Sequence, residues 1–133
     1  MAKLIRGERV GRLGKLVAST CATIFKSNRQ KILITRRSDN NRWCLPGGAM
    51  DAGESASEAC AREVLDETGL VVSVGKLVGV YSSPDLFIEY ADGNRVQGVT
   101  LGFEATEIEG VLALTSEPTE FGYFSIEECF PWT

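Results

Sequence analysis

Apolar and strand-forming residues recur in short runs along the chain and predict a protein built largely from strands. Residues 15–25 form one such run, and residues 31–36 alternate as a strand does, with a polar turn at 27–30 between them. These two runs predict a β-hairpin. After a polar loop and a glycine-rich turn, residues 71–81 form a further extended run.

The second half of the chain continues this pattern. Residues 87–90 and 95–106 flank an Asp92-Gly93 step, which is a strong hairpin signal. Residues 121–124 predict one more strand, and residues 125–130 open with an S-x-x-E pattern that predicts a short final helix. With a helix at 56–68, the pattern predicts an α/β sandwich with a mixed sheet, in a single domain spanning residues 1–133.

The helix at 56–68 has a start signal, a stop signal and a buried face. Ser55 and Glu58 form a capping box at its start, and Gly69 stands where a left-handed residue ends a helix. One side carries an apolar stripe that would pack on a sheet, made of Cys60, Ala61, Val64 and Thr68. We therefore expect Cys60 to be a core residue and not a nucleophile.

Three carboxylates, from Glu63, Asp66 and Glu67, share another face of this helix within an arc of roughly 100°. Like charges at this spacing destabilise a helix unless a cation compensates them. Because the chain has no histidine, oxygen ligands favour Mg²⁺, with Mn²⁺ as the alternative. A solvated stripe with i,i+4 pairs to Arg62 is the competing interpretation, but such pairs do not account for Glu63 and Glu67.

The loop and helix resemble the signature of the Nudix hydrolase superfamily over 23 residues. The matching positions are Gly48, Glu54, Arg62-Glu63-Val64, Asp66-Glu67 and Gly69-Leu70, with the spacing of that signature. The segment 43–48, Trp-Cys-Leu-Pro-Gly-Gly, is similar to the usual lead-in. Asp66 departs from the pattern, since the family most often has a glutamate there. Its shorter side chain would reach a metal through a water.

The resemblance implies a Nudix-type α/β/α sandwich that hydrolyses a nucleoside diphosphate linked to another moiety, with water attacking the diphosphate bridge. It implies that Glu63 and Glu67 bind Mg²⁺, with Asp66 as a lesser ligand. Glu54 and Arg62 would brace the loop against the helix, and Gly48 would allow close approach to the metal or phosphate.

The residues leave the general base and the phosphate contacts open. Glu63 or Glu67 could serve as base, and Glu117 lies in the region from which some relatives supply a further glutamate. Arg36, Arg37 and Arg42 precede the glycine turn and are candidate phosphate ligands, although each could simply be solubilising charge.

The sequence is least informative about the substrate. Pro84 lies at a position similar to that of a proline in the ADP-ribose pyrophosphatase branch, but proline is also an ordinary turn residue. ADP-ribose or a nucleoside diphosphate sugar is favoured. The alternatives are a nucleoside triphosphate, a dinucleotide, or a nucleotide-binding sensor without catalysis. Phe87, Tyr90 or Tyr81 could stack on a base or pack within the sheet.

Charge and composition bound the remaining possibilities. Residues 1–50 hold 11 of the 14 basic residues and two acids, a net of +9, while residues 51–133 have a net of −13. The spaced basic residues at the N-terminus lack interleaved aromatics, which speaks against a nucleic-acid partner. Scattered cysteines and the absence of a long apolar run predict a cytoplasmic protein with no membrane partner. The resemblance also implies a possible homodimer.

Overall fold

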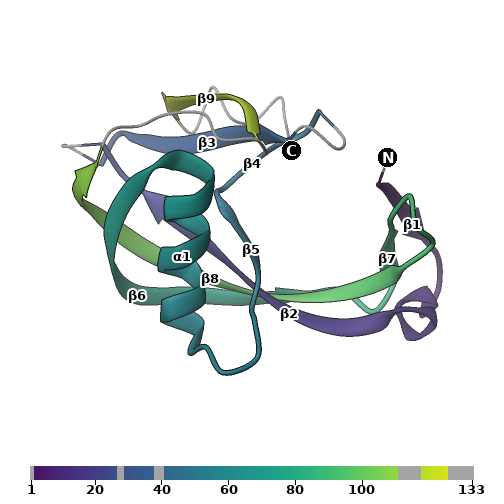
Figure 1. The fold of residues 1–133 in the computed structure, drawn as a ribbon. Coiled ribbons are helices and arrows are strands. Elements are labelled where there is room, and N and C mark those ends of the chain that lie inside the picture. The colour runs from purple at the N-terminus through teal and green to yellow at the C-terminus, as the bar shows by residue number, and fades with distance from the viewer. Residues whose placement is uncertain (1, 27–28, 38–40, 111–117, 126–133) are drawn as a thin grey trace.

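The computed structural model describes residues 2–26, 29–37, 41–110 and 118–125 (Figure 1). The elements are β1 (Lys3–Arg6), η1 (Val10–Leu13), β2 (Lys15–Ile24), β3 (Lys31–Arg37), β4 (Trp43–Cys44), β5 (Gly47–Ala49), α1 (Ala56–Thr68), β6 (Leu70–Ser82), β7 (Leu86–Glu89), β8 (Arg95–Gly110) and β9 (Pro118–Ser125). The predicted last helix at 125–130 falls almost entirely outside the described residues, and Ser125 itself ends β9.

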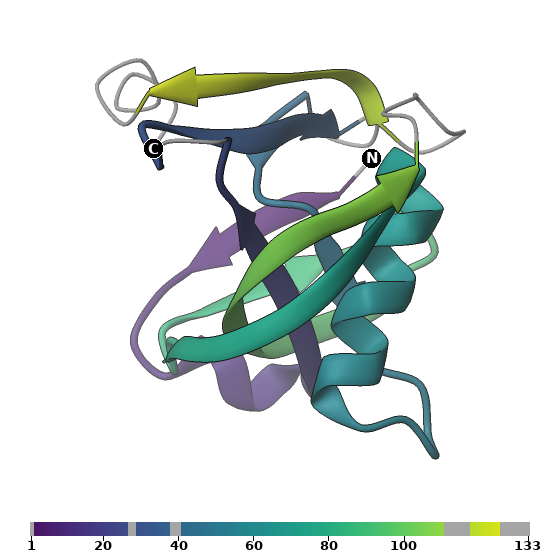
Figure 2. The ribbon, with the colours of Figure 1, turned by 90° about the vertical axis from the view of Figure 1, so that its left-hand side faces the viewer.

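The strands form two sheets. The larger has six strands in the order β1-β7-β8-β2-β5, and β6 pairs with another part of the long strand β8. It is mixed, because β2 runs parallel to β8 from Lys15↔Val96 to Ile24↔Ala105, whereas its other pairs are antiparallel. The smaller sheet has the order β4-β3-β9 and lies across one end of the larger one (Figures 1 and 2). The predicted α/β class and mixed sheet are confirmed.

The predicted hairpin of the first two strands is wrong. The chain does reverse there, since Lys26 N–H donates to the Lys31 carbonyl at 2.9 Å and one isolated bridge joins Phe25 to Ile32. Beyond that bridge the strands separate into different sheets, where β2 pairs with β8 and β3 pairs with β9. The later hairpin is confirmed, with Tyr90 N–H donating to the Asn94 carbonyl at 2.8 Å.

Helix α1 has the predicted bounds and caps. Ser55 Oγ accepts from Glu58 N–H at 3.1 Å and Glu58 Oε1 accepts from Ser55 N–H at 2.8 Å, so the capping box is complete. Gly69 ends the helix at φ 77°, a left-handed conformation that glycine adopts without strain. No helix in the described part of the chain is long and apolar enough to cross a membrane.

The apolar stripe of α1 packs on the larger sheet and forms the core. Cys60 and Val64 are fully buried, which confirms the interpretation of Cys60 as a core residue. They join a cluster that also contains Ala22, Ile24, Leu33, Leu70, Val72 and Ala105. This packing holds α1 against β2 and the short strand β5.

The position of β5 depends on its glycines. Gly47 and Gly48 lie opposite Cys21 and Thr20 on β2. A Cβ atom at Gly47 would lie 2.0 Å from the carbonyl oxygen of Thr20, and that neighbour is backbone that cannot rotate away. Strand β5 therefore sits closer to β2 than any other residue at position 47 would allow.

We expect Gly47→Ala to lower the free energy of unfolding by about 1–3 kcal/mol or more, as overpacking of a close contact does. Gly98→Ala is the control, because a Cβ there meets nothing within 4 Å. Urea denaturation of both variants measures the difference. Equal stability of the two would show that β5 is not held this tightly.

Candidate functional site

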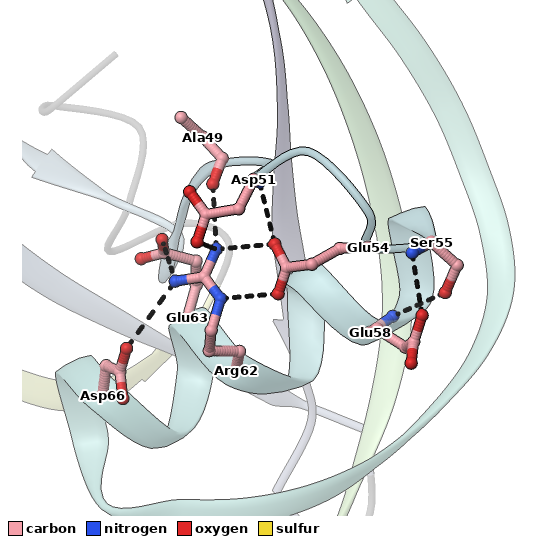
Figure 3. Close-up of polar contacts among 8 residues, drawn as sticks. All are labelled: Ala49, Asp51, Glu54, Ser55, Glu58, Arg62, Glu63 and Asp66. Atoms are coloured by element: carbon pink, nitrogen blue, oxygen red, sulfur yellow. Dashed lines mark hydrogen bonds and ion pairs between the residues drawn. The ribbon is translucent and has the colours of Figure 1, made fainter.

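Arg62 ties the loop before α1 to the helix. Its Nε donates to Glu54 Oε2 at 2.6 Å and its Nη2 donates to Glu54 Oε1 at 2.9 Å, a two-point contact between guanidinium and carboxylate (Figure 3). Nη2 also donates to the Ala49 carbonyl at 3.1 Å. The structure thus brings together the two residues predicted to brace loop and helix.

The same guanidinium also contacts the carboxylates on the acidic face of the helix. Arg62 Nη1 donates to Glu63 Oε1 at 2.8 Å and lies 3.7 Å from Asp66 Oδ2, while Nη2 lies 3.5 Å from Asp51 Oδ2. The sequence-based expectation that helix pairs leave Glu63 without a partner is wrong. Spacing along the helix favours i,i+4 pairs, but here the planar guanidinium also reaches its immediate neighbour.

These contacts fix the charge states of Glu54 and Arg62. The pKa of Glu54 is lowered to about 2, chiefly by the hydrogen bonds from Arg62 and then by the one from Asp51 N–H. Hydrogen bonds to Glu54 and then to Glu63 raise the pKa of Arg62 above its ordinary value. The pair is therefore ionised throughout the neutral range.

The two predicted metal ligands both lie against β5. A Cβ atom at Gly48 would be 2.6 Å from Glu63 Oε2, so the Glu63 carboxylate occupies the space that a side chain at position 48 would need. Glu67 is 7% exposed, and its Oε1 accepts from Gly47 N–H at 3.0 Å. Two successive glycines of β5 thus position two carboxylates one helical turn apart.

This arrangement fits Mg²⁺. Mg²⁺ usually takes one or two protein carboxylates and completes its shell with water and substrate oxygens, which matches Glu63 and Glu67 beside the glycine backbone. Asp66 is more exposed, at 61% of its side chain, and faces Arg62. In the described ranges, no three acidic or sulfur side chains are grouped closely enough to hold an ion by themselves.

A cavity of about 370 Å³ borders the same strand. Residues of β2, β7 and β8 line it together with Ala2, Cys44, Leu45 and all three residues of β5, and none of the described lining residues is charged. Ser19 Oγ and Thr100 Oγ1, both on its wall, are 2.9 Å apart. Strand β5 is thus shared between the acidic helix and an uncharged cavity.

The other predicted substrate residues lie elsewhere. Arg36 Nη1 donates to Glu120 Oε1 at 2.9 Å on the smaller sheet, and Arg42 is exposed after the loop. The carbonyl of Pro84 accepts from Gly11 N–H at 2.9 Å, next to η1. None of the three lines the cavity. Arg37 is placed on β3 only by its backbone, and Glu117 lies outside the described residues.

Among the aromatic candidates, Tyr90 lines the cavity, Phe87 is 4% exposed beneath Arg95, and Tyr81 is exposed. The sequence did not single out Asp51, the Ala49 carbonyl or the cavity wall. The wall could be found only from the pairing of β2 with β8, which brings together alternate residues of strands about 80 positions apart.

The chain is similar to known proteins in sequence and in fold. Residues 15–132 match the family model described as the NUDIX domain. A putative 8-oxo-dGTP diphosphatase of Bacillus subtilis is 46% identical over 61 residues, covering 46% of this chain and 41% of that protein. An ADP-ribose pyrophosphatase of Methanocaldococcus jannaschii is 44% identical over 64 residues, covering 47% of this chain and 38% of that protein.

The chain thus spans about two fifths of the length of these two curated relatives. Among solved structures, a MutT protein of Methanosarcina mazei Go1 superimposes with a TM-score of 0.72 at 26% identity, covering 90% of this chain and 84% of that one. The family match over residues 15–132 shows that the chain belongs to the Nudix family.

Proposed function

We propose that this protein is a Mg²⁺-dependent hydrolase that cleaves the diphosphate bridge of a nucleoside diphosphate linked to another moiety. One observation carries the proposal: strand β5 presents Glu63 and Glu67 on its helix side and borders an uncharged cavity of about 370 Å³. A substrate with its uncharged part in that cavity would bring its diphosphate to the glycines of β5.

Glu63 and Glu67 are the residues that would hold the ion. When bound, Mg²⁺ would neutralise charge on the diphosphate and activate the attacking water. The glycine backbone at 47 and 48 allows phosphate oxygens to approach without a side chain between them. A carboxylate would accept the proton of the water, since the chain has no histidine to do so, and Glu63, Glu67 and Glu117 are the candidates.

Arg62 and Glu54 act on the geometry of the ligands and not on the substrate. Their two-point contact fixes the loop, while the third arm of the guanidinium restrains Glu63. Outer contacts of this kind orient metal ligands, and their loss typically weakens metal affinity by roughly 10–100-fold.

ADP-ribose or a nucleoside diphosphate sugar is the proposed substrate class. The cavity wall offers hydroxyls and apolar surface, with Tyr90 available to stack on a base. One similar protein carries the name ADP-ribose pyrophosphatase, which supports this choice. A nucleoside triphosphate is the second candidate, because the relative from Bacillus subtilis is named for 8-oxo-dGTP.

The test is a panel of ADP-ribose, nucleoside diphosphate sugars, dinucleotides and nucleoside triphosphates with Mg²⁺ and identification of both products. We expect two phosphate monoesters from ADP-ribose, whereas release of pyrophosphate would select the triphosphate alternative. Glu67→Gln keeps the oxygen that accepts from Gly47 but loses the charge, so kcat should fall by more than the roughly 10–100-fold typical of outer contacts. Nucleotide binding without any turnover would indicate a sensor instead.

We expect Gly48→Ala to weaken Mn²⁺ binding by roughly 10-fold or more while lowering stability only slightly. The new Cβ would displace the Glu63 carboxylate, which is the end of a flexible side chain. Gly75→Ala, whose Cβ makes an ordinary contact 3.4 Å from the Glu104 carbonyl, is the control. Titration of Mn²⁺ by electron paramagnetic resonance compares the two, and unchanged affinity in Gly48→Ala would argue against Glu63 as a ligand.

We expect Glu54→Gln to be less stable than the wild type at pH 7, with a difference that disappears in acid. A carboxylate whose folded pKa is lowered from 4.5 to about 2 stabilises the fold above pH 4.5, and this contribution is lost as the pH falls towards 2. Thermal unfolding without metal between pH 7 and 2 measures it. Glu8→Gln, at an exposed glutamate, controls for the lost charge. A difference that persists unchanged at pH 2 would contradict the assignment.

A further inference from the structure

Thr20 carries a buried hydroxyl that nothing in the proposed mechanism uses. The residue lies in the middle of β2 and is 2% exposed. Its Oγ1 has no hydrogen-bond partner in the described part of the chain. Buried polar groups nearly always have partners, and one without a partner is unfavourable unless another ligand supplies it. The hydroxyl is therefore a feature that needs an explanation.

The side chain of Thr20 faces helix α1. Alternate residues of a strand share a face, and Ala22 and Ile24 on the same strand are fully buried in the core with Cys60 and Val64 of α1. Thr20 continues this row to the position opposite Gly48. Its hydroxyl thus lies between β2 and α1.

The cross-strand neighbour of Thr20 identifies what it faces. Thr20 is directly opposite Gly48 in the antiparallel pair of β2 and β5, and directly opposite residues project to the same face with Cβ positions about 5 Å apart. The Cβ position of Gly48 is occupied by Glu63, with Oε2 at 2.6 Å, Cδ at 2.7 Å and Oε1 at 2.9 Å. The Glu63 carboxylate therefore stands in the place of the side chain that would neighbour Thr20.

We propose that Thr20 is a positioning residue for Glu63 and that its hydroxyl donates a hydrogen bond to the Glu63 carboxylate when that carboxylate binds the metal. The inference rests on the proposed function. Arg62 donates to Glu63 Oε1 at 2.8 Å, while Glu63 Oε2 is the carboxylate atom nearest to the Cβ position of Gly48. A carboxylate has two oxygens and can accept from a hydroxyl while it binds an ion. The hydroxyl would orient Glu63 from β2, in addition to the contact from Arg62.

Two substitutions separate this role from simple packing. Thr20→Val keeps the shape and removes the hydroxyl, and Thr20→Ser keeps the hydroxyl and removes a methyl group. We expect Thr20→Val to leave the melting temperature of the metal-free protein unchanged or raised, because it removes a buried polar group without a partner. The same variant should bind Mn²⁺ roughly 10-fold more weakly. Thr20→Ser should show the reverse, with lower stability and wild-type Mn²⁺ affinity.

The experiment combines thermal unfolding in chelator with Mn²⁺ titration followed by electron paramagnetic resonance. Wild-type Mn²⁺ affinity in Thr20→Val would overturn the inference, as would a lower melting temperature of its metal-free form. Either result would show that the hydroxyl is unnecessary or already satisfied.

The same titration separates this inference from the proposed function. If the wild type binds Mn²⁺ and cleaves nothing in the substrate panel, the proposed function fails, while weaker Mn²⁺ binding by Thr20→Val still supports the role of Thr20. If the wild type is active and Thr20→Val matches it in Mn²⁺ affinity, only the role of Thr20 fails. If neither the wild type nor Glu67→Gln binds Mn²⁺, both fail.

Discussion

The close approach of β5 to its neighbours is the constraint on which the site depends. Gly47 and Gly48 present bare backbone to β2 and to the Glu63 carboxylate. Because of this, the Gly47 N–H reaches Glu67 at 3.0 Å and the Arg62 guanidinium reaches the carbonyl of Ala49. A side chain at Gly47 would push β5 away from the backbone of β2, and a side chain at Gly48 would displace the Glu63 carboxylate.

Charge balance within the site follows from this packing. Residues 51–67 carry six acids and one base, Arg62, so a single guanidinium must neutralise much of the local charge. It does so by contacting Asp51, Glu54, Glu63 and Asp66 at once. Several carboxylates share one cation, which leaves the site with an excess of negative charge that suits a divalent ion.

The sequence predicts the local parts of this structure well. The helix, its caps, its buried stripe and the hairpin at 91–94 depend on residues a few positions apart, and all are confirmed. The separation of β2 from β3 was missed because it depends on partners 81 to 94 residues away. The role proposed for Thr20 could not be predicted from the sequence for a similar reason, since it depends on the register of β2 against β5. The predicted ligand and phosphate roles remain predictions.

The parallel pairing of β2 with β8 has a consequence for how the protein folds. Its partners are 81 positions apart, so forming the pair closes a large loop before its contacts stabilise the chain. The loop and helix at 48–70 lie inside that loop, yet β5 depends on β2 for its partner and α1 depends on the sheet for its buried face. The segment 48–70 can therefore be recognised from residues close together in the sequence, but its stability depends on contacts with strands far away in the sequence. It would acquire its geometry late in folding, together with the rest of the domain.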